Sequence, residues 1–165
     1  MLDFGWPRAS LGGAAPLREA FVMTVAAILR HKGSAVASVR PDQTVADIAG
    51  QLATRRIGAL PVLENGALVG IISERDIMQA LATHGAAALD LPASALMTTK
   101  LSTVTRATTV GAAMRIMTDG RFRHLPVVED GALIGIVSIG DVVKARITQQ
   151  ETEVDSLKAY VAGSA

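Results

Sequence analysis

Two serine–aspartate pairs are the residues of this chain whose types and spacing best suit ligand chemistry. Ser73 precedes Asp76 by three positions, and Ser138 precedes Asp141 by the same distance. An ionised aspartate accepts hydrogen bonds from both hydroxyls of a cis-diol, and each bond to a charged group contributes about 1.5 to 3 kcal/mol. The N–H groups at the start of a helix favour phosphate. A pair that opens a helix therefore suits a cis-diol beside a phosphate.

The same spacing has a purely structural interpretation. Ser-x-x-Asp at a helix start forms a capping box, which stabilises the helix by roughly 1 kcal/mol. Taken alone, one pair favours this structural role, and the two roles can coexist. The surroundings of the pairs must decide.

A short basic segment offers charge for an anion. It contains Arg121, Arg123 and His124, which could instead form a solvated strand edge. His124 could also be a general base or a metal ligand. The other histidines, His31 and His84, lie in different segments without ligand spacing, so we expect no metal site.

Catalytic motifs do not fit the sequence. Ser138 has Ile136 two positions before it, so it is not the nucleophile of a G-x-S-x-G elbow. Lys32 lacks the upstream glycine of a phosphate-binding loop, and no G-x-G-x-x-G opens a helix after a strand. No acid and base are spaced to meet on one helix. We expect a protein that is not an enzyme and has no catalytic cofactor.

The elements that carry the serine–aspartate pairs occur twice. At an offset of 65 residues Pro61 aligns with Pro126 and Asp76 with Asp141, and no gap is needed between positions 44 and 145. The matching stretches include Leu-Pro-Val in one strand and Gly-Ile ahead of each serine. Chance does not produce such a match, so the chain holds two copies of one unit.

Each copy predicts the order β-α-β-β-α. A short alternating strand over Val36–Val39 precedes apolar residues at helical spacing between Val45 and Leu52. Two apolar runs joined by Asn65-Gly66 predict a β-hairpin, and Asp130-Gly131 has the same turn chemistry in the second copy. The serine of each pair then stands where a helix N-cap belongs. The expected fold class is mixed α/β.

The remaining segments complete the expected domain organisation. We expect a flexible N-terminal extension over 1–22, the first repeat over 23–84, a linker over 85–94, the second repeat over 95–148 and a helical tail over 149–165. The tail is polar with spaced Val154, Leu157 and Tyr160, which is typical of a helix that covers a neighbouring surface.

Composition narrows the class of protein. Half of the residues are apolar and 19% are charged, which excludes general disorder. Lys plus Arg number 16 against 15 Asp plus Glu, and aromatic residues make up 3%, so nucleic acid is not an expected partner. No segment reaches the roughly 18 to 20 apolar residues of a membrane span, so no membrane partner is expected either.

The expected location is the cytoplasm. Cysteine is absent, which fits a reducing compartment. The alternative is secretion, with Ala20–Leu29 as the apolar core of a signal peptide and Ala35-Val36-Ala37 as its cleavage site. That cleavage would remove part of the first predicted strand.

The duplicated pattern resembles the CBS domain, the cystathionine-β-synthase domain that works in pairs called Bateman modules. The resemblance rests on a Pro-Val strand before an Asn/Asp-Gly hairpin turn and on the motif Gly-h-h-Ser-x-x-Asp after it, where h is an apolar residue. Both features occur twice in the right order, and the resemblance covers about 23–148. The tail looks like that of free-standing bacterial CBS-pair proteins without an enzyme domain. The resemblance implies two repeats packed as a pseudo-twofold tandem pair, with two clefts that can each hold an adenosine nucleotide.

The resemblance also implies the residues of the two clefts. In the family an aspartate at the start of one repeat's second helix binds the ribose hydroxyls, a serine three residues earlier faces the ribose or phosphate, and the other repeat completes the cleft. For Asp76 and Ser73 the completing residues are Thr98, Ser102, Phe122, Arg123 and His124, with Arg75 and Arg121 to meet phosphate. For Asp141 and Ser138 they are Lys32, Ala37, Ile57, Gly58 and Ala59. The strand residues Pro61 and Pro126 belong to the same set of candidate nucleotide-binding residues.

The basic residues differ between the implied clefts. Gly140 occupies the position of Arg75, and Gly58 occupies that of Arg123. We therefore expect the first cleft to bind nucleotide more tightly. The second cleft is expected to be weaker, to hold a less charged ligand or to stay empty.

The expected function is regulatory. AMP, ADP or ATP would bind and alter a dimer contact or a contact with an unidentified regulated protein. Two alternatives remain: a reader of NAD(H) or S-adenosylmethionine on the same clefts, and an oligomerising adaptor whose clefts are only structural.

Val110, Met114 and Met117 form a stripe that we assign to the core or a dimer surface rather than to a cofactor site. Apolar helical faces predict a homodimer that buries about 1,200 Å² or more; they include Ala112, Ala113, Met114, Met117, Val142 and Val143.

Overall fold

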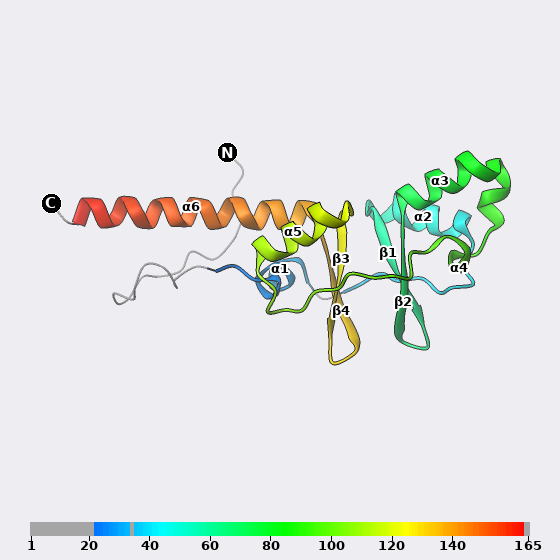
Figure 1. The fold of residues 1–165 in the computed structure, drawn as a ribbon, viewed down its shortest axis with the longest axis horizontal. Helices are drawn as coiled ribbons and strands as arrows, with labels where there is room; N and C mark the ends of the chain where they lie inside the picture. The colour runs from blue at the N-terminus through cyan, green and yellow to red at the C-terminus, as the bar shows by residue number, and fades with distance from the viewer. Residues whose placement is uncertain (1–21, 34, 164–165) are drawn as a thin grey trace. The chain divides into compact units, whose positions relative to one another are not determined.

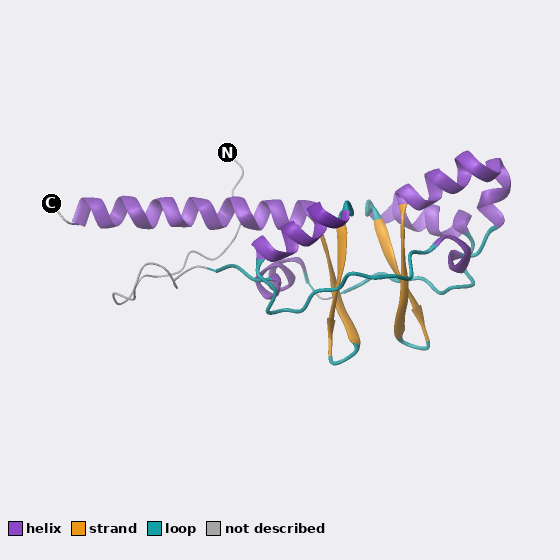
Figure 2. Ribbon diagram, in the orientation of Figure 1, coloured by secondary structure: helices purple, strands orange, loops and turns teal. Residues whose placement is uncertain are grey.

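The computed structural model describes residues 22–33 and 35–163, which form two compact units (Figure 1). The unit named here the α6 unit contains residues 22–33, 104–125 and 137–163, and the α3 unit contains residues 35–103 and 126–136. Helices and two-stranded sheets make up the chain (Figure 2). The mixed α/β fold class predicted from the sequence is confirmed.

The α3 unit holds most of the first repeat. Its elements are α2 (Val45–Arg55), β1 (Ala59–Glu64), β2 (Ala67–Ser73), α3 (Glu74–His84), the 3₁₀ helix η1 (Gly85–Asp90) and α4 (Ala93–Leu96). Thr44 caps α2 by accepting a hydrogen bond from Asp47 N–H at 3.2 Å. Helix α2 ends at Arg56, which adopts the left-handed conformation with φ 54°.

Strands β1 and β2 form the predicted hairpin. They are antiparallel, with Ala59 opposite Ser73 and Glu64 opposite Ala67. The turn residues Asn65 and Gly66 have φ values of 50° and 81°. Two consecutive positive φ angles define a type I′ turn, for which Asn-Gly is the preferred sequence.

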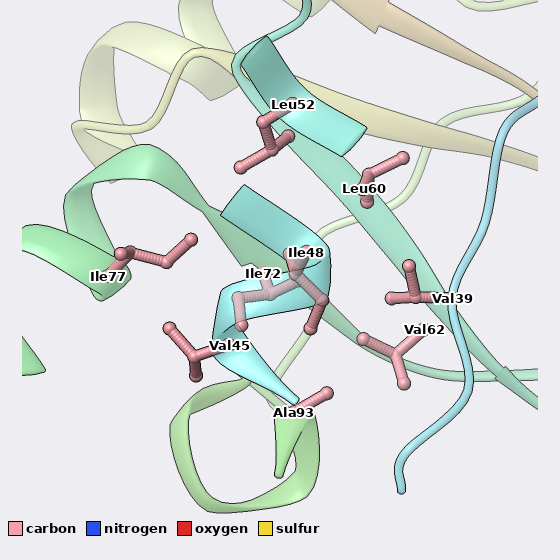
Figure 3. Close-up of a cluster of buried hydrophobic side chains, with 9 residues drawn as sticks. All are labelled: Val39, Val45, Ile48, Leu52, Leu60, Val62, Ile72, Ile77 and Ala93. Carbon is pink, nitrogen blue, oxygen red and sulfur yellow. The ribbon is translucent and has the colours of Figure 1, made fainter. Parts of the chain in front are cut away.

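The core of the α3 unit lies between α2, the hairpin and the segment after α3 (Figure 3). Burying one such apolar side chain contributes about 1.5 to 3 kcal/mol. The buried side chains of this cluster are Val39, Val45, Ile48, Leu52, Leu60, Val62, Ile72, Ile77 and Ala93. Ala93 belongs to the segment between the repeats, so this segment contributes to the core.

The strand predicted over Val36–Val39 is wrong in its extent. Val39 forms a single parallel bridge with Val62, through Val39 N–H to the Pro61 carbonyl oxygen at 3.0 Å. The chain then turns, because Gln43 N–H donates to the Arg40 carbonyl oxygen at 3.2 Å. This turn ends the pairing with β1 after Val39, and before Val39 the parallel ladder cannot continue because Pro61 has no N–H to donate.

The α6 unit is mainly helical and contains α1 (Val25–Lys32), α5 (Val110–Gly120) and α6 (Ile139–Gly163). Backbone hydrogen bonds attach α1 to the start of α5, from Val25 N–H to the Thr108 carbonyl oxygen at 2.8 Å and from Val110 N–H to the Met23 carbonyl oxygen at 2.9 Å. Helix α1 thus opens the first repeat in sequence but packs with helices of the second. The buried side chains include Val25, Ile28, Val110, Ala113, Met117, Val142 and Ala145.

The second hairpin repeats the first. Strands β3 (His124–Glu129) and β4 (Ala132–Ser138) form a two-stranded sheet. Its turn residues Asp130 and Gly131 have φ values of 50° and 77°. The Asp-Gly turn predicted from the sequence therefore has the geometry of the Asn-Gly turn.

Helix α6 runs without a break from Ile139 through the segment for which the sequence predicts a tail helix. The expected extension over 1–22 falls, apart from Val22, outside the described residues. Within the described part of the chain, no helix is both long and apolar enough to span a membrane.

Candidate functional site

The first serine–aspartate pair forms a capping box at the start of α3. Ser73 is the N-cap, with φ −123° and ψ 164°, and its Oγ accepts a hydrogen bond from Asp76 N–H at 3.4 Å. Asp76 Oδ2 accepts from both Ser73 N–H and Ser73 Oγ, each at 2.7 Å. The structural interpretation of the Ser-x-x-Asp spacing is therefore confirmed for this pair.

The second pair has the same geometry at the start of α6. Asp141 N–H donates to Ser138 Oγ at 3.2 Å, and Asp141 Oδ2 accepts from Ser138 N–H at 2.8 Å and from Ser138 Oγ at 2.9 Å. Among the described residues, Oδ1 of Asp76 and Oδ1 of Asp141 accept no hydrogen bond. Each carboxylate is thus held by Oδ2 and keeps one oxygen for another donor.

The residue that precedes each hairpin also accepts a backbone hydrogen bond from the first residue of the helix that follows the hairpin. Glu74 N–H donates to the Gly58 carbonyl oxygen at 3.0 Å in the α3 unit, and Ile139 N–H donates to the Arg123 carbonyl oxygen at 2.8 Å in the α6 unit. The two bonds are related by the 65-residue offset. They place Gly58 beside the Ser73–Asp76 pair and Arg123 beside the second pair.

Lys32 distinguishes the two aspartates. Its Nζ, at the end of α1, lies 2.8 Å from Asp141 Oδ2, and 40% of the Lys32 side chain and 25% of the Asp141 side chain are exposed. Partial burial raises the pKa of Asp141, but hydrogen bonds from Lys32 and Ser138 outweigh it, so the pKa lies below its ordinary value. In the described part of the chain, the hydrogen bonds to the Asp76 carboxylate come from Ser73 alone.

Phe122 is positioned by a glycine that the sequence analysis does not single out. A Cβ placed on Gly120 would overlap the Phe122 ring, so the ring packs against the bare backbone at the end of α5. Arg121, between them, caps α5 in the left-handed conformation with φ 54°. A Gly two positions before an aromatic residue is a weak signal, and it becomes informative only with the structure.

Arg56 is a second residue that sequence reasoning misses. It is exposed, it ends α2 with φ 54°, and it stands at the position of Arg121 in the repeat. The 65-residue offset is a sufficient signal to find it. By the repeat, Arg56 belongs with the residues expected around Ser138 and Asp141. It adds a positive charge to that set, which the comparison of Gly58 with Arg123 does not count.

The other predicted site residues are distributed over both units. Within the α6 unit the structure brings together Lys32, Ser138 and Asp141, with Arg123 at the same helix start. Within the α3 unit it brings together Ser73, Asp76 and Gly58, and Thr98 forms an antiparallel bridge with Ile71. Of the remaining candidates, Arg75 and Ser102 are exposed, Ala37, Ile57 and His124 are half-buried, and Ala59, Pro61 and Pro126 are buried. Each predicted set draws residues from both units.

A metal site is not predicted from the sequence. Among the described residues, no group of three or more His, Cys, Asp or Glu side chains is arranged to hold a metal ion. The Val110, Met114 and Met117 stripe lies on α5, where Val110 and Met117 are buried core residues, as the assignment to core predicts.

Both repeats match a family model, that of the CBS domain, over residues 24–83 and 93–148. The chain belongs to the CBS domain family. The CBS domain-containing protein CBSX3, mitochondrial, from Arabidopsis thaliana is 38% identical over 149 residues, which are 85% of this chain and 72% of that protein. The location in that name belongs to the relative, and a cytoplasmic location stays a prediction for this chain.

Solved structures give the same result. The CBS-domain containing protein ATU1752 from Agrobacterium tumefaciens is 43% identical, with a TM-score of 0.74 over 78% of this chain and 96% of that one. CBSX2, solved in complex with AMP, is 30% identical, with a TM-score of 0.64 over 76% of this chain and 97% of that one. These structures are CBS-domain proteins and confirm the family resemblance predicted from the duplicated motif.

Proposed function

We propose that this protein is a regulatory module that binds an adenosine nucleotide at the Ser-x-x-Asp helix starts of its CBS repeats. The observation that carries the proposal is the pair of aspartates, Asp76 and Asp141, each held by its serine through Oδ2 with Oδ1 accepting no hydrogen bond from the described residues. A relative that is 30% identical has been solved in complex with AMP. CBS-domain regulatory proteins are generally non-catalytic, which supports a sensor rather than an enzyme.

The fixed carboxylate suits the ribose of a nucleotide. In each capping box the serine holds the aspartate in one position before any ligand arrives. A ribose hydroxyl that donates to Oδ1 therefore forms a charge-assisted bond without first immobilising the side chain. The capping role and the binding role use different oxygens, so one residue can serve both.

Phosphate recognition falls mainly to side chains. At the start of α3 the N–H groups of Ser73, Glu74 and Asp76 all donate within the protein. These groups are not available to a phosphate, in contrast to the expectation from helix starts in general. The cationic candidates are Lys32, Arg56, Arg75, Arg121 and Arg123.

The two helix starts are expected to differ in affinity. Lys32 already contributes a hydrogen bond and a positive charge to Asp141, so that carboxylate is a weaker acceptor for a ribose hydroxyl. Among the described residues Asp76 accepts from no such cation, and Arg75 stands beside it in sequence where the second repeat has Gly140. We propose that Asp76 provides the tighter nucleotide site.

The regulatory output is proposed to be a change in a homodimer or in contacts with another protein. Met78 on α3 and Val143 on α6 occupy equivalent positions, and 65% and 41% of these apolar residues are exposed. Exposed apolar residues on helices favour an interface with a second chain. A nucleotide alters such an interface only if it binds the two arrangements with different affinity.

Thermal unfolding with and without ligand tests the proposal. AMP, ADP, ATP, NADH and S-adenosylmethionine are each added at millimolar concentration to wild type, Asp76→Asn and Asp141→Asn. Asparagine keeps an oxygen for the capping box but replaces the second oxygen and the charge. Asp47→Asn is the matched control, because Asp47 also lies in the first turn of a capped helix, α2.

The expected result is a nucleotide-dependent rise in the unfolding midpoint that Asp76→Asn reduces more than Asp141→Asn does and that Asp47→Asn preserves. At 100 times the Kd a ligand adds about 2.7 kcal/mol, which corresponds to about 5 to 10 °C for a chain of this size. A rise with NADH or S-adenosylmethionine alone would favour the alternative reader. No rise with any of the five compounds would overturn the sensor and favour the adaptor.

A further inference from the structure

Helix α6 carries, from Ile147 to Val161, an apolar stripe that its own unit leaves exposed. The exposed fractions are 50% for Ile147, 46% for Val154, 56% for Leu157 and 70% for Val161. The buried face of the helix, with Val142, Ala145 and Gln149, is a different one. We define the tail seam as Ile147, Gln150, Val154, Leu157 and Val161.

The spacing of the tail seam is that of a coiled coil. Its members are separated by three, four, three and four residues, so they repeat every seven. Ile147, Val154 and Val161 occupy the a positions, and Gln150 and Leu157 occupy the d positions. β-Branched residues at a with Leu at d favour a parallel dimer. A single polar residue in the seam, here Gln150, opposes shifted alignments because its amide needs an equivalent partner.

The charges that flank the tail seam fit a second copy of the same helix. In a parallel, in-register pair a g residue faces the e residue five positions later on the other chain. Arg146 then faces Glu151 of the second copy, and Glu153 faces Lys158 of the second copy. Both contacts are between opposite charges, and symmetry repeats each of them on the other side.

The antiparallel arrangement of the same seam lacks this complementarity. With Ile147 opposite Leu157, the helix would place Glu151 beside Glu151 and Glu153 beside Glu153 of the second copy. Like charges at these positions are destabilising. The alternative of an anionic membrane surface is also disfavoured, because Glu151, Glu153 and Asp155 outnumber Lys158 along the tail.

The contacts that these charges make on their own helix do not prevent the pairing. Glu153 Oε1 accepts from Gln149 Nε2 at 2.9 Å, and Lys158 Nζ lies 3.9 Å from Asp155 Oδ1. Both Lys158 and Asp155 have about three quarters of their side chains exposed, with 75% and 74% respectively. The exposed Lys158–Asp155 pair contributes little, so Lys158 can reach across to another helix, and Glu153 uses only Oε1 for Gln149 and keeps Oε2 for that contact.

We infer that α6 from Ile147 to Val161 forms a parallel, in-register two-stranded coiled coil with the same segment of a second copy of this chain. The pairing joins two chains independently of any nucleotide. Val143 is the d position one heptad before Gln150, so the tail seam continues the exposed apolar face of α6 from Ile147 to Val161, whereas Met78 belongs to the α3 unit. The inference therefore does not rest on the proposed nucleotide binding.

Cysteine crosslinking in the full chain tests the arrangement. The chain has no cysteine, so Leu157→Cys introduces a single thiol. In a parallel, in-register pair the two introduced thiols face each other, and mild oxidation is expected to convert most of the protein to a disulfide-linked dimer. Ala159→Cys is the matched control, because residue 159 lies about 200° further around the helix and should crosslink far less.

Charge reversal provides a second, independent readout. Glu153→Lys alone places two lysines in both symmetry-related contacts between residues 153 and 158. We expect a roughly tenfold higher Kd for the dimer in sedimentation equilibrium. Glu153→Lys combined with Lys158→Glu restores opposite charges and should restore the Kd. Residues five apart do not face each other on one helix, so this rescue can only come from the second copy.

Three outcomes would overturn the inference. The first is a monomeric wild-type chain at high micromolar concentration. The second is equal crosslinking of Leu157→Cys and Ala159→Cys. The third is crosslinking that requires a mixture of Ile147→Cys and Leu157→Cys chains, which would indicate an antiparallel pair. An unchanged circular dichroism spectrum in each variant excludes misfolding as the cause.

Discussion

The starts of α3 and α6 have the same backbone and capping geometry but different charges at the aspartate. At both, a serine hydroxyl and a serine N–H donate to Oδ2, and an N–H of the helix donates back to the serine. Only Asp141 also accepts from a lysine among the described residues, at 2.8 Å. A duplicated local motif therefore has two electrostatic environments.

The local motif and its electrostatics have separate origins. The capping box needs residues three positions apart, whereas Lys32 is 109 positions away from Asp141. Helix α1 supplies this lysine because it packs with α5 and α6 instead of with the rest of its own repeat. The second repeat has the shorter α4 in its place: Ala93 N–H donates to the Gln43 carbonyl oxygen as Val25 N–H does to that of Thr108, but α4 ends after four residues, so it has no turn equivalent to the one that carries Lys32. The symmetry of the sequence is therefore broken at this contact.

Removal of either aspartate should have the largest effect on folding stability. Asp76→Ala should cost about 1 kcal/mol, the usual value of a lost helix cap. Asp141→Ala should cost roughly 1.5 kcal/mol, because it also removes the ion pair with Lys32, whose contribution solvent screening reduces. Urea unfolding of both variants beside wild type measures the difference. Equal costs would mean that Lys32 adds nothing to stability.

Gly140→Arg tests the charge difference from the opposite direction. It gives the second repeat the cation that Arg75 provides in the first, and a Cβ at Gly140 would lie 3.6 Å from Ser138 Oγ, an ordinary contact. We expect a roughly fivefold gain in AMP affinity, or about 1 kcal/mol, at the Asp141 site. Calorimetry in an Asp76→Asn background isolates that site. An unchanged affinity would show that a cation beside the aspartate does not set the difference.

The sequence alone predicts the parts of this fold that depend on neighbouring residues. The Asn65-Gly66 and Asp130-Gly131 turns, the serine caps and the buried face of α2 follow from local spacing, and all are confirmed. The 65-residue repeat then connects these local signals and points to the CBS family. The strand over Val36–Val39 fails because Pro61 of β1 has no N–H to continue the parallel ladder before Val39, and the chain turns just after it.

The sequence could not show which charges meet at the candidate sites. The resemblance placed Lys32 near Asp141, but the ion pair and its capture of Oδ2 depend on the packing of α1. Similarly, the position of the Phe122 ring depends on Gly120, which has no distinctive pattern around it. Such contacts are set by tertiary packing, so periodicity and motif spacing carry no information about them.

The pH dependence of the Lys32–Asp141 pair should be the weakest of these effects. The pKa of Asp141 lies below its ordinary value in the folded chain, so the unfolded chain binds more protons between the two values. The resulting stability is present above the ordinary pKa of about 3.9 and is lost as the pH falls through the folded value. Lys32→Met keeps an apolar side chain of similar length but removes the cation. It therefore raises the pKa of Asp141 and reduces this stability.

The Lys32→Met variant should be less stable than wild type by about 0.5 kcal/mol at pH 7, and the difference should disappear as the pH falls below 4. Urea midpoints at several pH values between 7 and 3 provide the measurement. As a control, adding Lys32→Met to Asp76→Asn should cause the same pH-dependent loss, because the start of α3 lacks the lysine. A difference that persists at pH 3 would mean that Lys32 stabilises α1 by packing its methylene groups and not by its charge. In that case the charge of Lys32 would hardly affect Asp141. The proposed ranking of the two nucleotide sites would then rest on Arg75 alone.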